Sequence, residues 1–374
     1  MDILSYITLS SHKIIIILAG ILGLGFLIGI HELGHFLFCK LFRVSTPSFS
    51  IGFGPRLFSK QIGATKFSIS AIPLGGYVEI AGVAEVGQGE QKEAGRQDQF
   101  SFAKKRYYQK VLIMSGGILF NLLFAYLSLC FLFALGLPKS NILYPLNAKP
   151  VIETVSQNSA AEKAGIQKGD KILAFGQTQI KSVDVLVQTI QKKPDQKIDI
   201  LIERNGEKQT IPITVGKRDV QGKNIGSLGV TFEIAEQPGF PFFVAIKKGI
   251  YLTNRIIYGT IQAFKQLFVK RDVSNLSGPL SIISATAQGA SQGFKVFLLL
   301  LAFISINLAI LNLLPLPIFD GGQILYYTIE AIAGRSLPLK IRETIHVVSW
   351  LFILGLILYL TGKDILSMLP WFNK

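Results

Sequence analysis

Four long apolar runs dominate the pattern of hydrophobic and polar positions along the chain. About 20 apolar residues are enough to cross the hydrocarbon core of a bilayer. We therefore expect transmembrane helices within 1–40, 111–137, 294–317 and 346–361, of which the last is the shortest. The pattern predicts an α-helical polytopic membrane protein with about four transmembrane helices in a lipid bilayer.

The region 41–110, between the first two runs, has a different period. Residues 48–55 and 66–73 alternate apolar and polar positions, which is typical of β-strands, and 74–77 indicates a break. Because these strands are too apolar to lie free in solution, we expect a small membrane-associated β-hairpin or sheet. An ordinary β-subdomain at the membrane interface fits the pattern equally well. Residues 82–98 are rich in Gly, Glu and Gln and predict a mobile linker.

A soluble α+β domain is expected at 148–217, between the second and third runs. Strand patterns flank a short helix that begins at Ser159, where a Glu three residues later completes a capping box. A second helix is expected at 182–192, with apolar residues at helical spacing. Asn205-Gly206, between two later strand patterns, is typical of a type I′ hairpin turn.

Two further segments belong to the second half of the chain. Residues 239–293 begin with an aromatic and basic stretch whose mixed faces suit an amphipathic helix in the membrane interface. A fifth span is the alternative, although it would be interrupted by four cations, Lys247, Lys248, Arg255 and Lys265. Residues 318–345 start with Asp-Gly-Gly and predict a cytoplasmic turn.

Composition supports a membrane protein with a soluble insert. The 374 residues are 49% hydrophobic and 16% charged, with a mean hydropathy of +0.44, whereas about 25% of residues are charged in soluble domains. The net charge of +15 comes without a zinc-finger, RRM or helix-turn-helix signature, so we expect no nucleic-acid partner. Cys39 and Cys130 give no disulfide framework, and no signal-peptide cleavage site follows the first run.

Basic residues predict the orientation in the membrane. Loops with clustered Lys and Arg near helix ends remain in the cytoplasm. The loop between the first two runs holds such a cluster: Lys40, Arg43, Arg56, Lys60, Lys66, Lys104, Lys105, Arg106 and Lys110. We expect this loop to be cytoplasmic, and both termini and the 148–217 domain to face the outer side.

The first apolar run ends in His31-Glu32-Leu33-Gly34-His35. On a helix, this HExxH pentad places two imidazoles one turn apart on one face, where both can bind one Zn²⁺. Glu32 can then serve as general base for a metal-bound water. Charged side chains in hydrocarbon cost about 2.5–3.5 kcal/mol each on insertion scales unless they face a protein interior. The placement therefore indicates a metal site inside the membrane.

A third metal ligand is expected from another membrane segment, since a catalytic zinc has three protein ligands and one open position. Asp320 follows Pro315 and Pro317 at the end of the third run, and those prolines free backbone groups that must be satisfied within protein. An Asp-Gly-Gly is by itself a common turn, and His346 at the start of the fourth run is the competing candidate. We predict Zn²⁺ bound by His31, His35 and Asp320.

Taken together, these motifs resemble the site-2 protease family of intramembrane zinc metalloproteases. The resemblance covers essentially the whole chain and rests on HELGH at 31–35, Gly52-Phe53-Gly54, Pro73-Leu-Gly-Gly-Tyr77 and Asn312-x-x-Pro315-x-x-x-x-Asp320-Gly321. Residues 272–279 and 312–322 are similar, more narrowly, to the bacterial regulator of sigma-E protease (RseP) subfamily. Residues 159–170 resemble a circularly permuted bacterial PDZ domain, although a structural insert without a ligand remains the alternative.

Three departures from the family pattern stand out. Enteric members carry two PDZ domains, and this chain has room for one. Gln323 replaces a common His after Asp-Gly-Gly, and Gly117 replaces a common Pro in the second run. None of these positions is an expected metal ligand, but the single PDZ-like domain bears on how substrates are selected.

The resemblance implies a reaction, a substrate class and a location. It implies hydrolysis of peptide bonds within transmembrane segments of pre-trimmed single-span proteins, such as an anti-sigma factor or remnant signal peptides. The location implied is the bacterial inner membrane, with the active site near the cytoplasm and a peptide or protein stump at the periplasmic PDZ-like domain.

Substrate-binding roles are expected for the Gly52-Phe53-Gly54 strand edge and for Asn312 and Asn121, which can satisfy a substrate or backbone carbonyl. Two other functions remain open. One is a catalytically inactive protease-like scaffold that binds peptides through its PDZ-like domain. The other is a metal transporter or metal chaperone.

Overall fold

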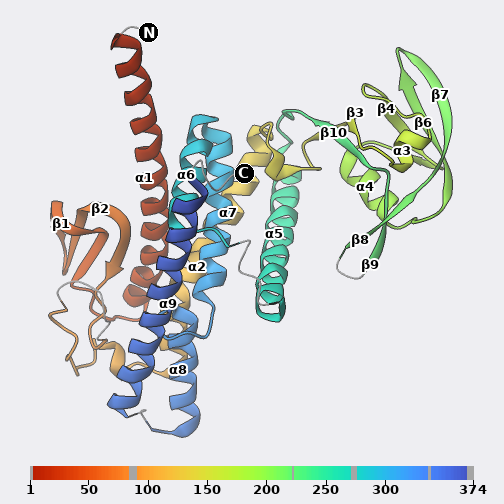
Figure 1. The fold of residues 1–374 in the computed structure, drawn as a ribbon. Helices are drawn as coiled ribbons and strands as arrows, with labels where there is room; N and C mark the ends of the chain where they lie inside the picture. The colour runs from red at the N-terminus through yellow and green to blue at the C-terminus, as the bar shows by residue number, and fades with distance from the viewer. Residues whose placement is uncertain (1–2, 84–90, 221–222, 271–275, 336–337, 369–374) are drawn as a thin grey trace. The chain divides into compact units, whose positions relative to one another are not determined.

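The computed structural model describes residues 3–83, 91–220, 223–270, 276–335 and 338–368. The chain forms two compact units (Figure 1). One combines Met1–Ala134 with Pro241–Lys374 and is called the membrane unit here. The other, Leu135–Phe240, is called the inserted unit.

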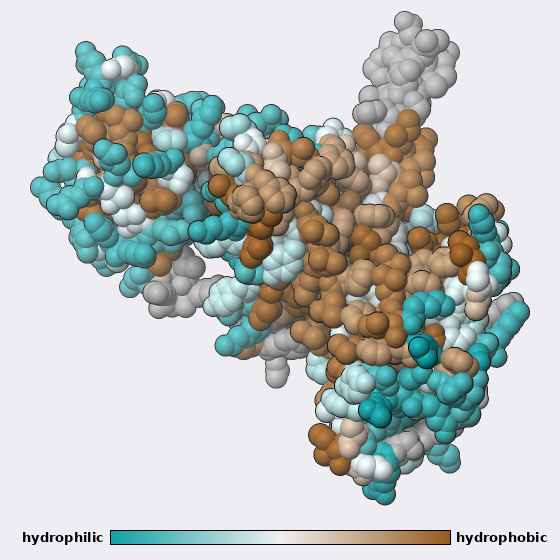
Figure 2. Space-filling model, turned by 180° about the vertical axis from the view of Figure 1, so that it is seen from behind, coloured by the Kyte–Doolittle hydropathy of each residue, from teal (hydrophilic) through white to brown (hydrophobic). Residues whose placement is uncertain are grey.

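Among the described residues, four helices of the membrane unit are long and apolar enough to cross a bilayer, which is the number that the sequence predicts. Many of their large apolar side chains are exposed, Leu22, Leu127 and Leu351 among them, and Figure 2 shows hydrophobic residues gathered on one face of the helical part. Such a surface is expected where helices meet lipid instead of water. The spans are Ile14–Leu41 of α1 (Ile3–Leu41), α2 (Tyr107–Leu135), α7 (Phe294–Asn312) and Lys340–Ser367 of α9 (Leu339–Met368).

Glycines allow α1 and α2 to touch beside the HExxH pentad. A Cβ on Gly34 would collide with the backbone of Gly116, and a Cβ on Gly116 would collide with the backbone of Gly34. Small residues at a crossing point are the usual means by which membrane helices approach closely. As a result, α2 passes directly against the face of α1 that carries His31 and His35.

The region after α1 forms a two-stranded sheet of β1 (Ser48–Ile62) and β2 (Thr65–Val78) with several register shifts. A hairpin turns at Gly63, with φ of 60°, and pairs 56–62 with 65–70. Residues 49–51 also pair with 76–78, so β2 continues through 74–77, where the sequence predicted a break. The pairing of Gly76 with Ile51 continues the strand across this segment.

This sheet packs along α1. The Phe36 ring meets the rings of Phe49 and Phe67 edge-on, with centroids 5.6 and 5.5 Å apart. Two turns toward the N-terminus, the absence of a side chain at Gly29 makes room for Ile51. These contacts fix the sheet beside the pentad. Residues 84–90 of the predicted linker lie outside the described residues.

The remaining helices of the membrane unit are α5 (Phe242–Lys270), α6 (Pro279–Ser291) and α8 (Asp320–Ala333). α5 contacts α2, where the Tyr126 hydroxyl donates to the Asn254 side chain at 2.5 Å. α6 packs against α1, α7 and α9. Its first turn is bound to α9 through Asp364, which accepts hydrogen bonds from the Ser281 N–H and hydroxyl at 2.9 and 2.6 Å.

Two predicted segments differ from the structure. The single interfacial segment expected at 239–293 consists of two helices, α5 and α6, and α5 is not among the four candidate spans. Residues 271–275 of this predicted segment, which include the start of the family motif at 272–279, lie outside the described residues. The turn expected at 318–345 is mostly the helix α8, because Asp320 opens a helix whose first turn contains both glycines and which ends at the left-handed Gly334.

The inserted unit is built on one antiparallel sheet with the strand order β10-β3-β4-β6-β7, and β5 pairs with β4. The predicted local signals are present: the Ser159 hydroxyl caps α3 by accepting from the Glu162 N–H at 3.2 Å, and Asn205 and Gly206 adopt positive φ values of 52° and 87°. The strands are β3 (Ala148–Val155), β4 (Lys171–Phe175), β5 (Thr178–Gln179), β6 (Lys197–Arg204), β7 (Glu207–Thr214) and β10 (Val230–Ile234).

The unit extends beyond the predicted 148–217, because β10 pairs with β3 and completes the sheet. Two helices and a small β-hairpin cover it: α3 (Ala160–Lys163), α4 (Val183–Gln191), β8 (Gly216–Val220) and β9 (Lys223–Ser227). Its core contains Phe175, Leu186 and Ile200, all fully buried. The unit therefore has an apolar core of its own.

An ion pair with a buried carboxylate connects the residue before β4 to the end of β6. Arg204 donates to both carboxylate oxygens of Asp170, at 2.7 and 2.6 Å. Burial by itself raises the pKa of Asp170, but hydrogen bonds from Arg204 and from the Gln167 N–H lower it below its ordinary value. Asp170 therefore stays ionised at neutral pH, and the stability that this pair contributes would be lost only as the pH falls through that lowered pKa.

Candidate metal centre and active site

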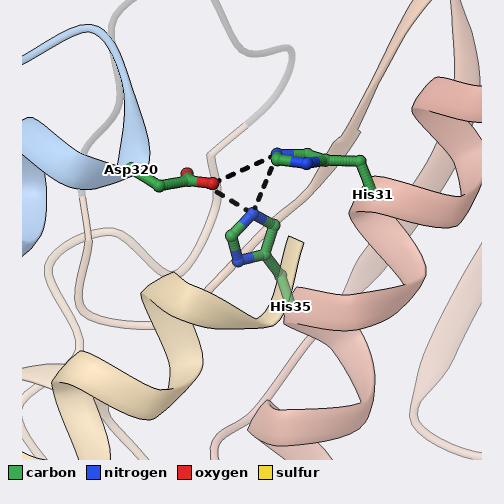
Figure 3. A group of neighbouring side chains, drawn as sticks. All are labelled: His31, His35 and Asp320. Atoms are coloured by element: carbon green, nitrogen blue, oxygen red, sulfur yellow. Dashed lines mark hydrogen bonds and ion pairs between the residues drawn. The ribbon is translucent and has the colours of Figure 1, made fainter. Parts of the chain in front are cut away.

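Three side chains from two distant segments converge in the membrane unit: His31 and His35 from α1 and Asp320 from the start of α8 (Figure 3). His31 Nε2 lies 3.3 Å from Asp320 Oδ2, and His35 Nε2 lies 3.4 Å from Asp320 Oδ1. The two imidazole Nε2 atoms are 3.2 Å apart. Both imidazoles are buried, so the group lies in a protein interior at the level of the first span.

The opposite ring nitrogen of each imidazole faces α2. His35 Nδ1 donates to the Ile113 carbonyl oxygen at 2.9 Å. Because that oxygen can only accept, the His35 proton is on Nδ1, and Nε2 turns its lone pair to the centre. His31 Nδ1 lies 3.1 Å from Asn121 Nδ2. The second helix therefore orients both imidazoles that the first helix supplies.

Glycines in α2 and at the start of α8 make room for the three ligand side chains. A Cβ on Gly117 would collide with the His31 ring. On the other side, a Cβ on Gly321 or Gly322 would collide with the carbonyl of Leu313 or of Leu316, respectively. The start of α8 can therefore lie against the turn after α7, which brings Asp320 to the two imidazoles.

Gln323, one of the departures from the family pattern, supports the same turn. Its side-chain N–H donates to the Pro317 carbonyl at 2.8 Å. Pro315 and Pro317 interrupt helical hydrogen bonding, and backbone groups freed in this way need partners inside a membrane protein. Gln323 thus satisfies a carbonyl of the turn that precedes Asp320.

Glu32 lies beside the β1–β2 sheet. A Cβ on Gly76 would come within 3.2 Å of Glu32 Cγ, so the glycine leaves space for this side chain. Gly76 belongs to β2 and pairs there with Ile51 of β1. The carboxyl group next to His31 is therefore placed between α1 and the sheet, close to extended backbone.

The donor set fits a zinc ion. Two imidazole nitrogens and one carboxylate are a common set of protein ligands in catalytic zinc sites and leave a fourth position open. The three ligand atoms lie within 4.8 Å of one another. Asp320 Oδ2 is buried and accepts no hydrogen bond. A bound cation would give this oxygen the partner that buried polar atoms normally have. The competing candidate, His346, does not belong to this group.

The other predicted site residues lie in different surroundings. Gly52 and Gly54 have positive φ values of 90° and 82° in β1, and the Phe53 side chain between them is 38% exposed. Asn312 is the last residue of α7 and is half-buried. Asn121 is fully buried against His31, which is a neighbour that the sequence analysis did not foresee.

Sequence reasoning also missed the roles of Ile113, Gly116 and Gly321. A backbone carbonyl acceptor carries no side-chain signal, so Ile113 could not have been found. The glycine pairs at 116–117 and 321–322 were visible, and their position within or next to apolar runs was the signal for close helix contact.

Comparison with known proteins defines the class. The chain matches Peptidase family M50 over residues 19–356 and belongs to this family, the site-2 protease family. Together with four candidate spans and the buried group of ligand residues, this makes the protein a multi-pass membrane enzyme, a zinc metallopeptidase.

Similar proteins occur in diverse bacteria. A predicted zinc metalloprotease of Campylobacter jejuni is 32% identical over 358 residues, covering 93% of this chain and 92% of that protein. The zinc metalloprotease RasP of Geobacillus kaustophilus is 29% identical, covering 93% and 97%. A predicted zinc metalloprotease of Agrobacterium fabrum is 30% identical, covering 93% and 95%.

Among solved structures, the PDZ domain of the SdrC-like protein from Listeria monocytogenes is similar to part of this chain. The matched region covers 23% of this chain and 87% of that domain. The identity is 17% and the TM-score 0.21. A score this low does not establish a shared fold.

Replacing Gly117 by Ala should lower the zinc content of the purified protein. The added methyl group would collide with the His31 ring, and overpacking of this kind costs about 1–3 kcal/mol, which corresponds to about 5–150-fold in affinity. Zinc per chain, measured by atomic emission, checks this. Gly355→Ala is the matched control, because a Cβ there meets nothing within 4 Å. Full zinc in Gly117→Ala would contradict the packing argument.

Proposed function

We propose that this enzyme hydrolyses peptide bonds within transmembrane segments of single-span membrane proteins that have already been trimmed outside the membrane. The observation that supports this most is that His31 and His35 lie inside the candidate span Ile14–Leu41 while Asp320 reaches them from α8. Chemistry located at that depth acts on chains that are themselves in the membrane.

In this proposal His31, His35 and Asp320 hold Zn²⁺. A zinc ion held by these three side chains would polarise the scissile carbonyl and lower the pKa of a bound water from about 15.7 toward 7. The protein contributes the geometry: Ile113 fixes the ring of His35, and the Gly321–Gly322 contact fixes the start of α8. Outer partners that orient ligands in this way commonly change metal affinity or activity 10–100-fold when they are removed.

Glu32 is the proposed general base. It is next to His31 in the chain and faces the strand edge at Gly76, so a polypeptide lying along that edge would be close to its carboxyl group. Glu32 would take the proton of the attacking water and pass it to the leaving amine. Nothing in this role requires Glu32 to bind the metal.

The β1–β2 sheet is the proposed platform for the unwound substrate. A helix hides its carbonyls in its own hydrogen bonds, so the scissile segment must become extended before attack, and an extended segment can add to a strand edge. Gly52 and Gly54 flank Phe53, which pairs with Ile72 between the two longer paired stretches of β1. Asn312 and Asn121 are the candidates for hydrogen bonds to substrate or backbone carbonyls.

The inserted unit is proposed to be a PDZ-like domain that recognises the trimmed stump of the substrate. Two strands, β10 and β7, form the outer edges of its sheet, where an added peptide strand would find free backbone groups. Candidate substrates are an anti-sigma factor and remnant signal peptides. A domain that admits only short stumps would restrict cleavage to chains that an earlier protease has shortened.

The proposed location is the bacterial inner membrane. The basic loop that contains β1 and β2 would be cytoplasmic, and the inserted unit periplasmic. The active site would then lie near the cytoplasmic end of the first span.

Glu32→Gln should retain zinc and lose proteolysis. Removing the base leaves both imidazoles and Asp320 unchanged, whereas turnover should fall about 10²–10⁴-fold. Cleavage of a model single-span substrate in detergent and zinc content are measured side by side. An inactive scaffold would show no cleavage even in the unaltered protein, and undiminished cleavage by Glu32→Gln would refute the assignment of the base.

Asp320→Ala should lose zinc and activity together, while His346→Ala should keep both. The Asp320 carboxylate faces both imidazoles, and His346 is outside the ligand group. Asp320→Asn is expected to retain weak binding, because its amide oxygen still reaches but lacks the charge. Full zinc in Asp320→Ala together with loss in His346→Ala would reverse the choice of third ligand.

Reporter fusions test the orientation. An enzyme reporter inserted at Gly95, where a Cβ meets nothing within 4 Å, should give a cytoplasmic signal. The same reporter inserted in the Asn205-Gly206 turn should give a periplasmic signal, because the basic cluster lies in the loop that contains Gly95. Both reporters on one side of the membrane would overturn the number of spans between them.

A further inference from the structure

Three polar atoms on α8 and near the start of α9 are buried without a hydrogen-bond partner: Tyr326 Oη, Arg342 Nε and His346 Nε2. The two helices lie side by side here (Figure 1), and the Arg342 guanidinium is 5.0 Å from the centroid of the Tyr326 ring. His346 follows Arg342 by one turn on the same face of α9. Because buried polar groups are nearly always paired, these atoms point to a ligand that can form hydrogen bonds.

The charged groups around these atoms are mostly cations. Arg342 donates through Nη2 to the carboxylate of Glu330, one turn after Tyr326 on α8. Lys110, at the start of α2, lies over the Tyr327 ring with its Nζ 5.5 Å from the centroid. The charge of Lys110 interacts with those of Glu330 and Arg342. Two cations therefore accompany one carboxylate, and this group of three has an excess positive charge.

The unpartnered atoms suit an oxyanion. A guanidinium has five N–H donors and no acceptor, so the pairing of Arg342 with Glu330 leaves Nε–H for a second anion. The Tyr326 hydroxyl can donate to the same anion, and a neutral imidazole such as His346 can donate from one ring nitrogen. Phosphate oxygens accept several such bonds, and the planar fork of an arginine matches their geometry.

The group lies where a membrane span begins. Arg342 is near the start of the candidate span Lys340–Ser367, and Lys110 is near the start of the candidate span Tyr107–Leu135. The ends of a span lie at the level of the lipid headgroups. Large apolar side chains are exposed one position before each member of the group on α8 and α9: Leu325, Ile329, Ile341 and Ile345. Acyl chains would meet these side chains while the phosphate meets the donors.

We propose that Tyr326, Arg342 and His346 bind the phosphate of an anionic phospholipid in the contact between α8 and α9. Basic pockets between membrane helices on the cytoplasmic side are typical sites for such headgroups, and this is the side on which the basic loop before α2 lies. Phosphatidylcholine has the same phosphate, but its trimethylammonium group is disfavoured next to Lys110 and Arg342. The proposal is independent of proteolysis and of the metal centre.

The test measures which phospholipid lies beside Trp350, an exposed residue about two turns after Arg342 on α9. The full-length protein carries Trp371→Phe, which leaves Trp350 as its one tryptophan, and is placed in vesicles of phosphatidylglycerol and phosphatidylcholine. Brominated acyl chains quench tryptophan fluorescence, and they are introduced on one lipid and then on the other. Comparison of the two quenching curves gives the preference for phosphatidylglycerol.

Two variants of this protein lose a hydrogen-bond donor and keep the net charge. Tyr326→Phe retains the ring beside the guanidinium and loses the hydroxyl. Arg342→Lys retains a cation that can pair with Glu330 and loses the Nε–H. Tyr359→Phe is the matched control, because it removes an exposed hydroxyl about 25 Å further along α9.

The unaltered protein should prefer phosphatidylglycerol. The preference should fall about tenfold in Tyr326→Phe, because a hydrogen bond to a charged group is lost, and by at least as much in Arg342→Lys. Tyr359→Phe should have the preference of the unaltered protein, since its hydroxyl is not part of the group.

Equal quenching by the two lipids in the unaltered protein would overturn the proposal, and so would an unchanged preference in Tyr326→Phe. Displacement of brominated phosphatidylglycerol by micromolar inorganic phosphate would show that the group selects a free anion, and would overturn the lipid as its ligand. If Tyr326→Phe fails to fold, the preference of Arg342→Lys decides.

Discussion

The placement of two imidazoles inside a candidate membrane span, with the carboxylate of Asp320 beside them, is the constraint on which the rest of the membrane unit depends. Lipid offers no hydrogen bonds, so each polar atom must find a partner within protein. The partners are close because α1 and α2 touch at Gly34 and Gly116, which puts the Ile113 carbonyl and the Asn121 amide against the two rings. Larger residues at this crossing would separate the helices and leave the imidazoles unpartnered.

The same requirement explains the break between α7 and α8. A continuous helix after Asn312 would carry Asp320 past the pentad, whereas the turn with Pro315 and Pro317 lets α8 start beside it. Gln323 satisfies a carbonyl in that turn, and two glycines allow it to pack tightly. In the loop before α2, Phe102 packs on Tyr327 of α8 with ring centroids 5.2 Å apart, which holds the helix that presents the carboxylate.

The two compact units contain different parts of the proposed enzyme. The membrane unit contains the ligand group and the sheet that lies beside Glu32, while the inserted unit has its own core and its own buried ion pair between Asp170 and Arg204. A recognition domain that folds around its own core can bind a soluble stump without disturbing the polar group in the membrane. This division suits an enzyme whose proposed substrates have one part in water and the scissile part in lipid.

The sequence by itself determined the elements whose signals are local. Uninterrupted apolar runs predicted the spans, the spacing of HELGH predicted two ligands on one helix face, and Asn205-Gly206 predicted its hairpin turn, because each depends on residues a few positions apart. The sequence also suggested Asp320 as third ligand, since the two prolines and the pentad together made an intramembrane Asp informative.

Tertiary structure alone decided what depends on contacts between distant segments. It turned the expected 318–345 turn into α8, continued β2 through 74–77 by pairing with β1, and extended the inserted unit to β10 by pairing with β3. It also placed Asn121 against His31. Which residues face each other across two helices depends on the rotation and crossing of both, and a single chain's pattern of apolar positions does not specify these.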